Sequence, residues 1–274
     1  MHENDRRSRF AEEARAERPD LATLCLLIGA EADPSLDEAG MDAAQIELDR
    51  LAGLLPYGLS GPRAWTAALA DLLGGREGFH GTPGDYQYLE SSLLHHVLTR
   101  RRGLPILLSV VWIEVARRAG AHVYGVSLPG HFVVGFGDPG DQVLADPFAA
   151  GRQLSAEDAE LLVTGATGSP LTPSMLTPAD PLAVVSRILN NIRAWAALRP
   201  EHSAVALWAL DLLLLLPSHP ARLRYERAQV LVQRGDFLAG AAAMETYAEV
   251  VDAVEPTTAE RIRSQARAAR ARLN

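Results

Sequence analysis

The fold is decided by residues 128–147, which read Leu128-Pro-Gly-His-Phe-Val-Val-Gly-Phe136, then Gly137-Asp-Pro-Gly-Asp141, then Gln142-Val-Leu-Ala-Asp-Pro147. Two short apolar runs separated by a cluster of Gly, Pro and Asp predict a β-hairpin. With Asp138 and Pro139 at the centre of the turn, His131 becomes the cross-strand partner of Asp146, within side-chain reach. A carboxylate that orients an imidazole supplies two members of a catalytic triad, which raises the question of a nucleophile.

The composition is that of a globular protein. The chain has 274 residues, of which 48% are hydrophobic and 22% are charged, and this length predicts two structural units. The formal net charge of -8 argues against nucleic acid as the main partner, because phosphate binding needs a clustered excess of Lys and Arg. The most apolar stretches, 205–216 and 106–115, are too short to cross a bilayer, so we expect no membrane partner.

Residues 1–19 mix charges of both signs and contain no apolar core. They do not resemble a signal peptide, so we expect a cytoplasmic protein with a mobile N-terminal segment. The single cysteine, Cys25, excludes an internal disulfide and is interpreted as a buried helix residue. His95 and His96 are adjacent and should point in different directions on a helix. Since no His-Glu-x-x-His or Cys-x-x-Cys motif occurs either, we expect no metal and no cofactor.

Helical patterns flank the hairpin on its N-terminal side. Residues 21–73 are predicted to be helical with Asp20 as N-cap, and the glycine-rich stretch 74–85 should interrupt them. Further helices are predicted over 89–98 and 106–119, the second opening at Pro105, whose missing N–H costs nothing in a first turn. That second helix is apolar nearly all round, so it must be central.

After the hairpin, Ser155 is predicted to cap a short helix over 156–163, and 165–180 has the composition of a linker. Beyond it we predict only helices, over about 181–198, 203–216, 220–234, 236–253 and 257–272. Helix ends at Pro217 and Pro256, with a tight turn at Gly235 followed by small residues, resemble tetratricopeptide repeats. A generic helical bundle is the alternative. The predicted domains are therefore 20–175 and 176–274, after the mobile segment 1–19.

The whole pattern resembles the bacterial SirB-one family, which joins a transglutaminase-like domain to a tetratricopeptide-like tail. The residues that carry the resemblance are spaced in order along the chain: Glu77-Gly-Phe79, Asp85-Tyr86, Ser92, Arg101-Arg-Gly-Leu-Pro-Ile106, Glu114-Val-Ala-Arg-Arg118, Leu128-Pro-Gly-His-Phe132, Asp146-Pro-Phe148, Gly151-Arg-Gln-Leu-Ser155 and Ile188-Leu-Asn-Asn-Ile192. The resemblance implies an α+β fold with a papain-like transglutaminase core, in which a buried helix packs on an antiparallel sheet. It also implies a helical N-terminal part and an all-α tetratricopeptide-like C-terminal domain.

In active transglutaminase-like enzymes a Cys stands at the start of the buried helix, where the helix end lowers the thiol pKa. The resemblance places Pro105 at that position, and Pro carries no nucleophile. Ser109 lies one turn further along the same face and is the replacement to consider. However, Ser109 lies about 6 Å further along the helix than Pro105, which is too far for the position of the nucleophile. The alternative is that its hydroxyl donates a hydrogen bond to the carbonyl of Pro105 in the core.

Two functions from different classes fit these residues. The first is a module without the usual nucleophile that binds a peptide or protein segment, with Pro105 and Ile106 at the helix start and Arg101 and Arg152 forking onto an acidic ligand. Both arginines can instead belong to a solvated charged face. The second is an acyl transferase or amide or ester hydrolase, with His131 as general base and Asp146 as orienter. A buried His-Asp contact that only locks two strands is the structural alternative.

Overall fold

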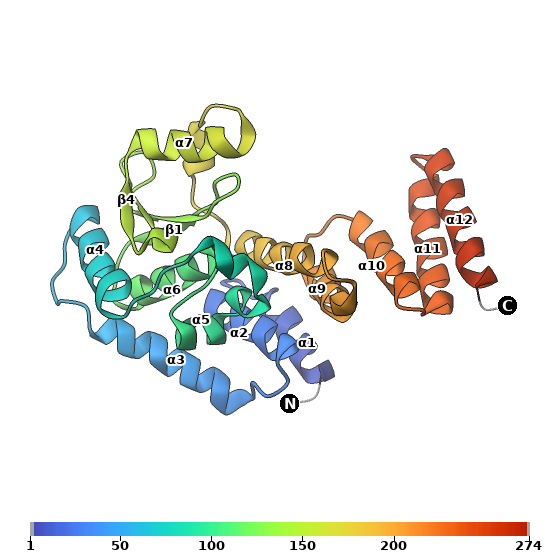
Figure 1. The fold of residues 1–274 in the computed structure, drawn as a ribbon, viewed down its shortest axis with the longest axis horizontal. Helices are drawn as coiled ribbons and strands as arrows, with labels where there is room; N and C mark the ends of the chain where they lie inside the picture. The colour runs from blue at the N-terminus through green and yellow to red at the C-terminus, as the bar shows by residue number, and fades with distance from the viewer. Residues whose placement is uncertain (1–2, 273–274) are drawn as a thin grey trace. The chain divides into compact units, whose positions relative to one another are not determined.

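The computed structural model describes residues 3–272, whose contacts group them into two compact units (Figure 1). Among these residues the first unit holds 3–9 and 16–188, and the second holds 10–15 and 189–272. The predicted border between residues 175 and 176 falls inside the first unit. Part of the N-terminal segment expected to be mobile forms helix α1 (Glu3–Glu13), in which Arg7 Nε donates to Glu31 Oε1 at 2.9 Å. Residues 1 and 2 of that segment lie outside the described residues.

The N-terminal part of the first unit is helical, as the pattern predicted. It contains α2 (Leu21–Ala32), α3 (Glu38–Gly53), α4 (Pro62–Leu69) and a π-helical stretch, Ala70–Arg76. Asp20 is the predicted N-cap of α2, because its side chain accepts from Thr23 N at 2.8 Å.

The predicted helix over 89–98 is two pieces in the structure. A 3-10 turn, Leu89–Ser92, follows a first one at Pro83–Gln87, and α5 (Leu94–Arg100) begins after Leu93. Leu93 breaks the helix because its backbone is extended, with φ -119° and ψ 120°. The next helix, α6 (Pro105–Arg118), opens at the predicted proline, and every residue from Pro105 to Ala116 is buried. It is therefore the central helix that its apolar sequence predicted.

A four-stranded antiparallel sheet follows, in the order β1 (Val123–Val126), β2 (Val133–Phe136), β3 (Val143–Asp146) and β4 (Arg152–Leu154). The predicted hairpin is β2–β3, but its register differs from the prediction by two residues, since Val134 pairs with Ala145. Extended by one residue, this register sets Asp146 opposite Val133. His131 is thus the diagonal neighbour of Asp146 and stays on the same face, because side chains alternate with a period of two.

The sheet lies between two helices, α6 on one face and α7 (Ala156–Thr167) on the other (Figure 1). The α7 face is held by a cluster of buried side chains that includes Tyr124, Val126, Leu144 and Val163. Ser155 caps α7 as predicted, and Asp158 completes a capping box with it. The predicted linker carries one 3-10 turn, Pro173–Leu176, before α8 (Pro181–Ala197) begins.

The described residues of the second unit form helices and the loops that connect them, without a strand. After the end of α8 come α9 (Ser203–Leu215), α10 (Arg222–Gln233), α11 (Phe237–Asp252) and α12 (Pro256–Ala271). Small side chains fill the core of α10–α12, among them Ala228, Ala241 and Ala266. The fold class is confirmed: a helical N-terminal part, a small antiparallel sheet on a buried helix, and an all-helical C-terminal region. Within residues 3–272, no helix has the length and apolar composition that a bilayer-spanning segment requires.

Candidate functional site

His131 and Asp146 meet at one end of the sheet, where the inner strand β3 ends. His131 Nε2 lies 3.0 Å from Asp146 Oδ1, and the two side chains are 14% and 7% exposed. The ring N–H does not point squarely at the carboxylate, so the contact is close enough for an ion pair without the alignment of a good hydrogen bond. Because Nε2 faces the carboxylate, Nδ1 is the ring nitrogen left for another partner.

The backbone after β3 fixes the carboxylate of Asp146. Its Oδ1 accepts from Phe148 N at 3.0 Å, which caps a 3-10 turn, Pro147–Ala149. Gly151 then returns the chain into β4, with φ +85° and its N–H donating to the Asp146 carbonyl at 2.8 Å. A side chain at Gly151 would strike the Trp112 ring on α6, with its Cβ 2.3 Å from a ring carbon. The sheet and α6 together therefore hold Asp146 in place.

Aromatic rings cover His131. The Phe148 ring meets the imidazole edge to face, with centroids 6.1 Å apart and planes at 84°. Tyr86 meets Phe148 in the same way at 6.3 Å, and about half of its surface is exposed. Burial, together with the negative charge of Asp146, raises the pKa of the Tyr86 hydroxyl. The site is thus an imidazole and a carboxylate beside an aromatic wall.

Arg187 in α8 fastens the segment that carries His131. Its guanidinium donates to the carbonyl of His131 at 2.8 Å, to the carbonyl of Leu128 at 2.9 Å and to Ser127 Oγ at 2.6 Å. Burial lowers the pKa of this side chain. The sequence analysis missed Arg187, although a lone cation in the apolar stretch 184–189 is a signal that can be recognised, because a half-buried arginine needs acceptors.

The start of α6 offers no exposed nucleophile. Pro105 and Ile106 are both buried. Ser109 is fully buried, and its hydroxyl donates to the carbonyl of Phe132 at 3.4 Å. The alternative role predicted for Ser109, a bond to the carbonyl of Pro105, therefore named the wrong acceptor. The long bond to the Phe132 carbonyl ties α6 to the segment between His131 and β2. Ser109 as a nucleophile therefore stays a prediction, now with its hydroxyl in the core.

The one thiol of the chain lies elsewhere. Cys25 on α2 is buried, and its pKa is raised by burial and by the negative charges of Glu114 and Asp20. Glu114 is nine residues after Pro105 on α6, a rise of about 13 Å along the helix. Cys25 is thus a core residue near the far end of α6, as its apolar sequence context predicted.

The two arginines predicted to bind a ligand are engaged in ion pairs. Arg101 pairs with Glu47 at 2.5 Å and Glu77 at 3.2 Å, and its guanidinium lies over the Phe79 ring. Arg152 pairs with Asp158 at 2.9 Å on the surface. The structure brings His131 and Asp146 together but places both arginines against carboxylates of the chain itself.

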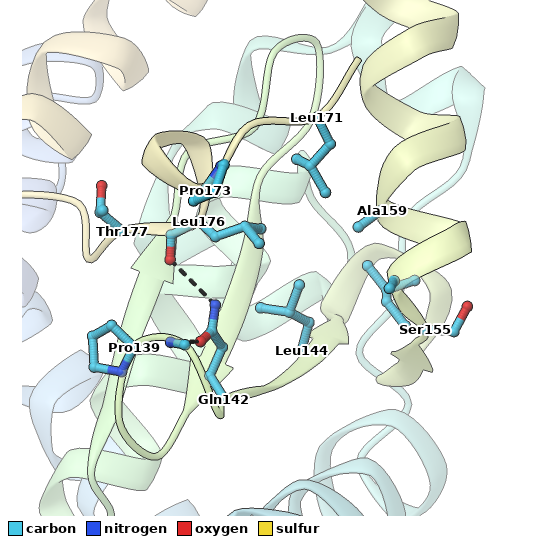
Figure 2. A pocket seen from close by; sticks show the side chains of 12 residues that line it. Pro139, Gln142, Leu144, Ser155, Ala159, Leu171, Pro173, Leu176 and Thr177 are labelled. Atoms are coloured by element: carbon cyan, nitrogen blue, oxygen red, sulfur yellow. Dashed lines mark hydrogen bonds between the residues drawn. The ribbon is translucent and has the colours of Figure 1, made fainter.

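A cavity of about 460 Å³ lies on the α7 side of the sheet, and neither His131 nor Asp146 lines it. Figure 2 shows Leu144, Leu171 and Leu176 gathered around it. Gln142 closes one end, where its Nε2 donates to the Leu176 carbonyl at 3.4 Å. The cavity is mainly apolar and carries no group suited to acid-base chemistry.

Comparison with known proteins agrees with this architecture. A family model described as "Transglutaminase-like superfamily" matches residues 42–190, and one described as "Tetratricopeptide repeat" matches residues 192–274. A UPF0162 protein of Xylella fastidiosa (strain 9a5c) is 35% identical over 163 residues, which are 58% of this chain and 58% of that protein. A UPF0162 protein of Haemophilus influenzae is 27% identical over 184 residues, 66% of this chain and 68% of that protein.

A eukaryotic protein shares a shorter region. F-box only protein 21 of Mus musculus is 30% identical over 122 residues, 42% of this chain and 19% of that protein. Among solved structures, a crystal structure of menin aligns with 89% of this chain and 69% of that chain at 14% identity, with a TM-score of 0.44 that is too low to support an argument. The chain spans 58% of the length of the Xylella relative. The first family model covers more than half of the 274 residues of this chain. The chain therefore belongs to the transglutaminase-like superfamily and carries tetratricopeptide repeats in its C-terminal part, as the sequence resemblance predicted.

Proposed function

We propose that this chain is a transglutaminase-like module that binds a peptide or protein segment and does not use a thiol nucleophile. The observation that supports this most is Pro105 at the start of the buried helix, beside a His131–Asp146 pair at 3.0 Å. The only thiol is buried near the other end of α6. We keep the cytoplasm as the proposed compartment, because a free, buried Cys25 needs no oxidising surroundings.

The helical second unit supplies a surface suited to a partner segment. A groove of about 830 Å³ is lined by side chains of α8, α9, α10 and the turn that follows α8. Its charged lining residues are Arg193, Arg199, Arg222 and Glu226, an excess of positive charge. Glu226 accepts from Arg222 Nε at 2.8 Å and also pairs with Arg193. Tetratricopeptide repeats generally bind segments of other proteins, and this groove favours an acidic one.

A pair of matched peptides tests the groove. A fluorescein-labelled peptide of alternating Glu and Leu should bind the full chain, and its Lys-for-Glu twin should not, as measured by fluorescence anisotropy at low and at physiological salt. Arg222→Glu should weaken binding of the acidic peptide at least about tenfold, since it reverses a charge in the groove. Arg261→Glu, an exposed change on α12 outside the groove, is the control. Equal binding of both peptides, or no effect of Arg222→Glu, contradicts this part of the proposal.

The absence of thiol chemistry is tested separately. Amide, ester and thioester substrates are incubated with the full chain and with His131→Ala, after circular dichroism has shown that both are folded. We expect no turnover that depends on His131. Turnover that disappears in a stably folded His131→Ala variant would overturn the non-catalytic proposal.

That outcome would favour a second candidate, hydrolysis with His131 as general base. Its support is the partial exposure of His131 and the position of Asp146 at Nε2, which leaves Nδ1 to take a proton from water as the water attacks an acyl carbon. The same proton then passes to the leaving group. This candidate predicts that Asp146→Asn lowers kcat more than it raises KM.

A further inference from the structure

A second histidine cluster lies in the first unit, away from His131. Asp33, His95 and His96 each offer a ligand atom, and these atoms lie within 4.8 Å of one another. The expectation that adjacent histidines on a helix cannot converge is wrong here. His95 and His96 occupy the first turn of α5, and their ring centroids are only 4.1 Å apart, with the planes inclined by 38°.

We propose that Asp33, His95 and His96 bind one divalent transition-metal ion, with Zn²⁺ as the best match. Two imidazole nitrogens and one carboxylate oxygen are a donor set that Zn²⁺ accepts, with a water molecule in the fourth position. Three protein ligands and one open position are also compatible with Co²⁺ and Ni²⁺, whereas Mg²⁺ and Ca²⁺ prefer oxygen donors. The ion would join the end of α2 to the start of α5.

The carboxylate of Asp33 is already oriented. Its Oδ1 accepts from Ser35 N at 2.9 Å and from Ser35 Oγ at 2.7 Å. These two bonds hold the C-cap of α2 and leave Oδ2 facing the His95 ring, 3.8 Å from Nε2. Hydrogen bonds of this kind to the outer oxygen are what orients ligand carboxylates in metal sites.

The His95 ring has polar atoms that the described protein does not satisfy. Its side chain is only 13% exposed, and neither Nδ1 nor Nε2 has a hydrogen-bond partner within residues 3–272. Gly29 on α2 makes room for the ring, because a Cβ there would lie 2.6 Å from His95 Nδ1. A buried imidazole without a hydrogen bond is costly unless something outside the protein occupies its lone pair, and a metal ion does so.

The distances are close to what an ion needs. Around tetrahedral Zn²⁺, with bonds of about 2.0–2.1 Å, donor atoms lie about 3.3 Å apart. His95 Nε2 and Asp33 Oδ2 therefore need to approach by about 0.5 Å, and the widest pair by about 1.5 Å, which side-chain rotation can supply. His95 also lines a cavity of about 370 Å³ between α3 and α5, so there is open space on one side of its ring.

Zinc binding is tested on the full chain, prepared without a histidine tag and treated with a chelator that is then removed. Isothermal titration with ZnCl₂ at pH 7.5 should give one ion per chain. Asp33→Asn keeps the Ser35 contacts and removes the charge, and His96→Asn removes one nitrogen ligand. Each should weaken binding by more than about 100-fold, because loss of a direct ligand costs more than loss of its hydrogen-bond partner. His122→Asn, at a surface pair with Asp138, should bind as the unmodified chain does.

Cobalt supplies a readout that a structural effect cannot imitate. Co²⁺ bound by these ligands should give visible d–d absorption, which disappears in His96→Asn and persists in His122→Asn. The proposal is overturned if ZnCl₂ shows no binding tighter than about 100 μM, or if Asp33→Asn and His96→Asn both retain the ion with unchanged affinity. If either variant is unfolded by circular dichroism, the other decides.

Discussion

Two His–Asp pairs lie at opposite ends of strand β2 and contain the same two residue types, but they differ in distance and in exposure. His131 and Asp146 lie 3.0 Å apart, with side chains 14% and 7% exposed. His122 and Asp138 lie 3.5 Å apart beside the β2–β3 turn, with side chains 65% and 90% exposed. The first pair is covered by aromatic rings and fixed through the backbone, whereas both side chains of the second pair are exposed to solvent. Burial, and not the kind of residue, decides whether such a pair has structural and chemical weight.

The largest loss of stability is expected from a substitution that displaces Phe148, whose ring covers His131 in the buried pair. A Cβ added at Gly81 would lie 2.0 Å from two ring carbons of Phe148 and 2.8 Å from the Gly103 carbonyl oxygen. Gly81→Ala should therefore displace the ring that covers His131 and lower the free energy of unfolding by about 3 kcal/mol. Gly53→Ala, where a Cβ meets nothing within 4 Å, should be neutral or stabilise by up to about 1 kcal/mol. Urea denaturation of both variants is the measurement, and equal stabilities would contradict the packing argument.

Removing one carboxylate from each pair compares them directly. Asp146→Ala leaves Phe148 N without its acceptor and His131 without its partner, so it should cost about 2–3 kcal/mol. Asp138→Ala should change the stability by no more than about 0.5 kcal/mol, since both members of its pair are exposed. Thermal unfolding of the two variants checks this. A similar loss for both would show that burial is not the deciding factor.

Double-mutant cycles separate the pair from its surroundings. The coupling free energy between His131 and Asp146 should be about 1.5 kcal/mol, and that between His122 and Asp138 no more than about 0.5 kcal/mol. Each cycle uses Ala at both positions and is measured by chemical denaturation. A negligible coupling in the buried pair would mean that Asp146 acts mainly through its bond to Phe148 N.

A smaller change in stability, which depends on pH, is expected at Glu47, a carboxylate of intermediate exposure. The hydrogen bond from Arg50, with further help from Arg101, lowers the pKa of Glu47 to about 2, although partial burial opposes the shift. Because this folded-state pKa lies below the ordinary value of 4.5, the stabilisation is complete above about pH 4.5 and is lost as the pH falls toward 2.

The side chain of Glu47 is 24% exposed, so we expect this stabilisation to be about 1 kcal/mol after solvent screening. Urea denaturation between pH 5 and pH 2.5 should therefore show a shallower loss of stability in Glu47→Gln than in the unmodified chain. Arg101→Ala should flatten the same region, because it removes one of the partners. An unchanged slope in both variants would contradict the assignment of this ion pair.

The sequence predicted that His131 and Asp146 lie close together, but it did not predict the strand register that brings them there. The turn residues placed a hairpin correctly, but their centre was taken at Asp138 and Pro139, and the observed pairing of Val134 with Ala145 differs by two residues. His131 and Asp146 are still in contact, because a register shift of two residues leaves both side chains on the same face of the sheet as diagonal neighbours. The apolar stretch around Arg187 marks it as an unusual residue, but that local pattern does not show that its acceptor is the His131 carbonyl, 56 residues away in the chain.

The prediction that His95 and His96 point in different directions failed for another reason. Helical periodicity correctly describes where Cα–Cβ bonds point, but it does not fix the rotamers of two rings in a first helical turn. Their approach to Asp33 depends on Gly29 of α2, which leaves space for His95. The single helix predicted over 89–98 failed for a related reason, because the extended backbone of Leu93 is set by its surroundings and not by helix propensity.

The sequence by itself determined the elements that depend on local chemistry. Asp20 and Ser155 cap their helices, Pro105 opens a helix apolar enough to be central, and residues 192–274 carry the tetratricopeptide pattern. Only the tertiary structure decided which groups these side chains contact. Arg101 pairs with Glu47, Arg187 donates to the His131 carbonyl, and Ser109 donates to the Phe132 carbonyl. Local preferences act over a few residues, whereas these contacts join residues between 23 and 56 positions apart, and packing alone brings them together.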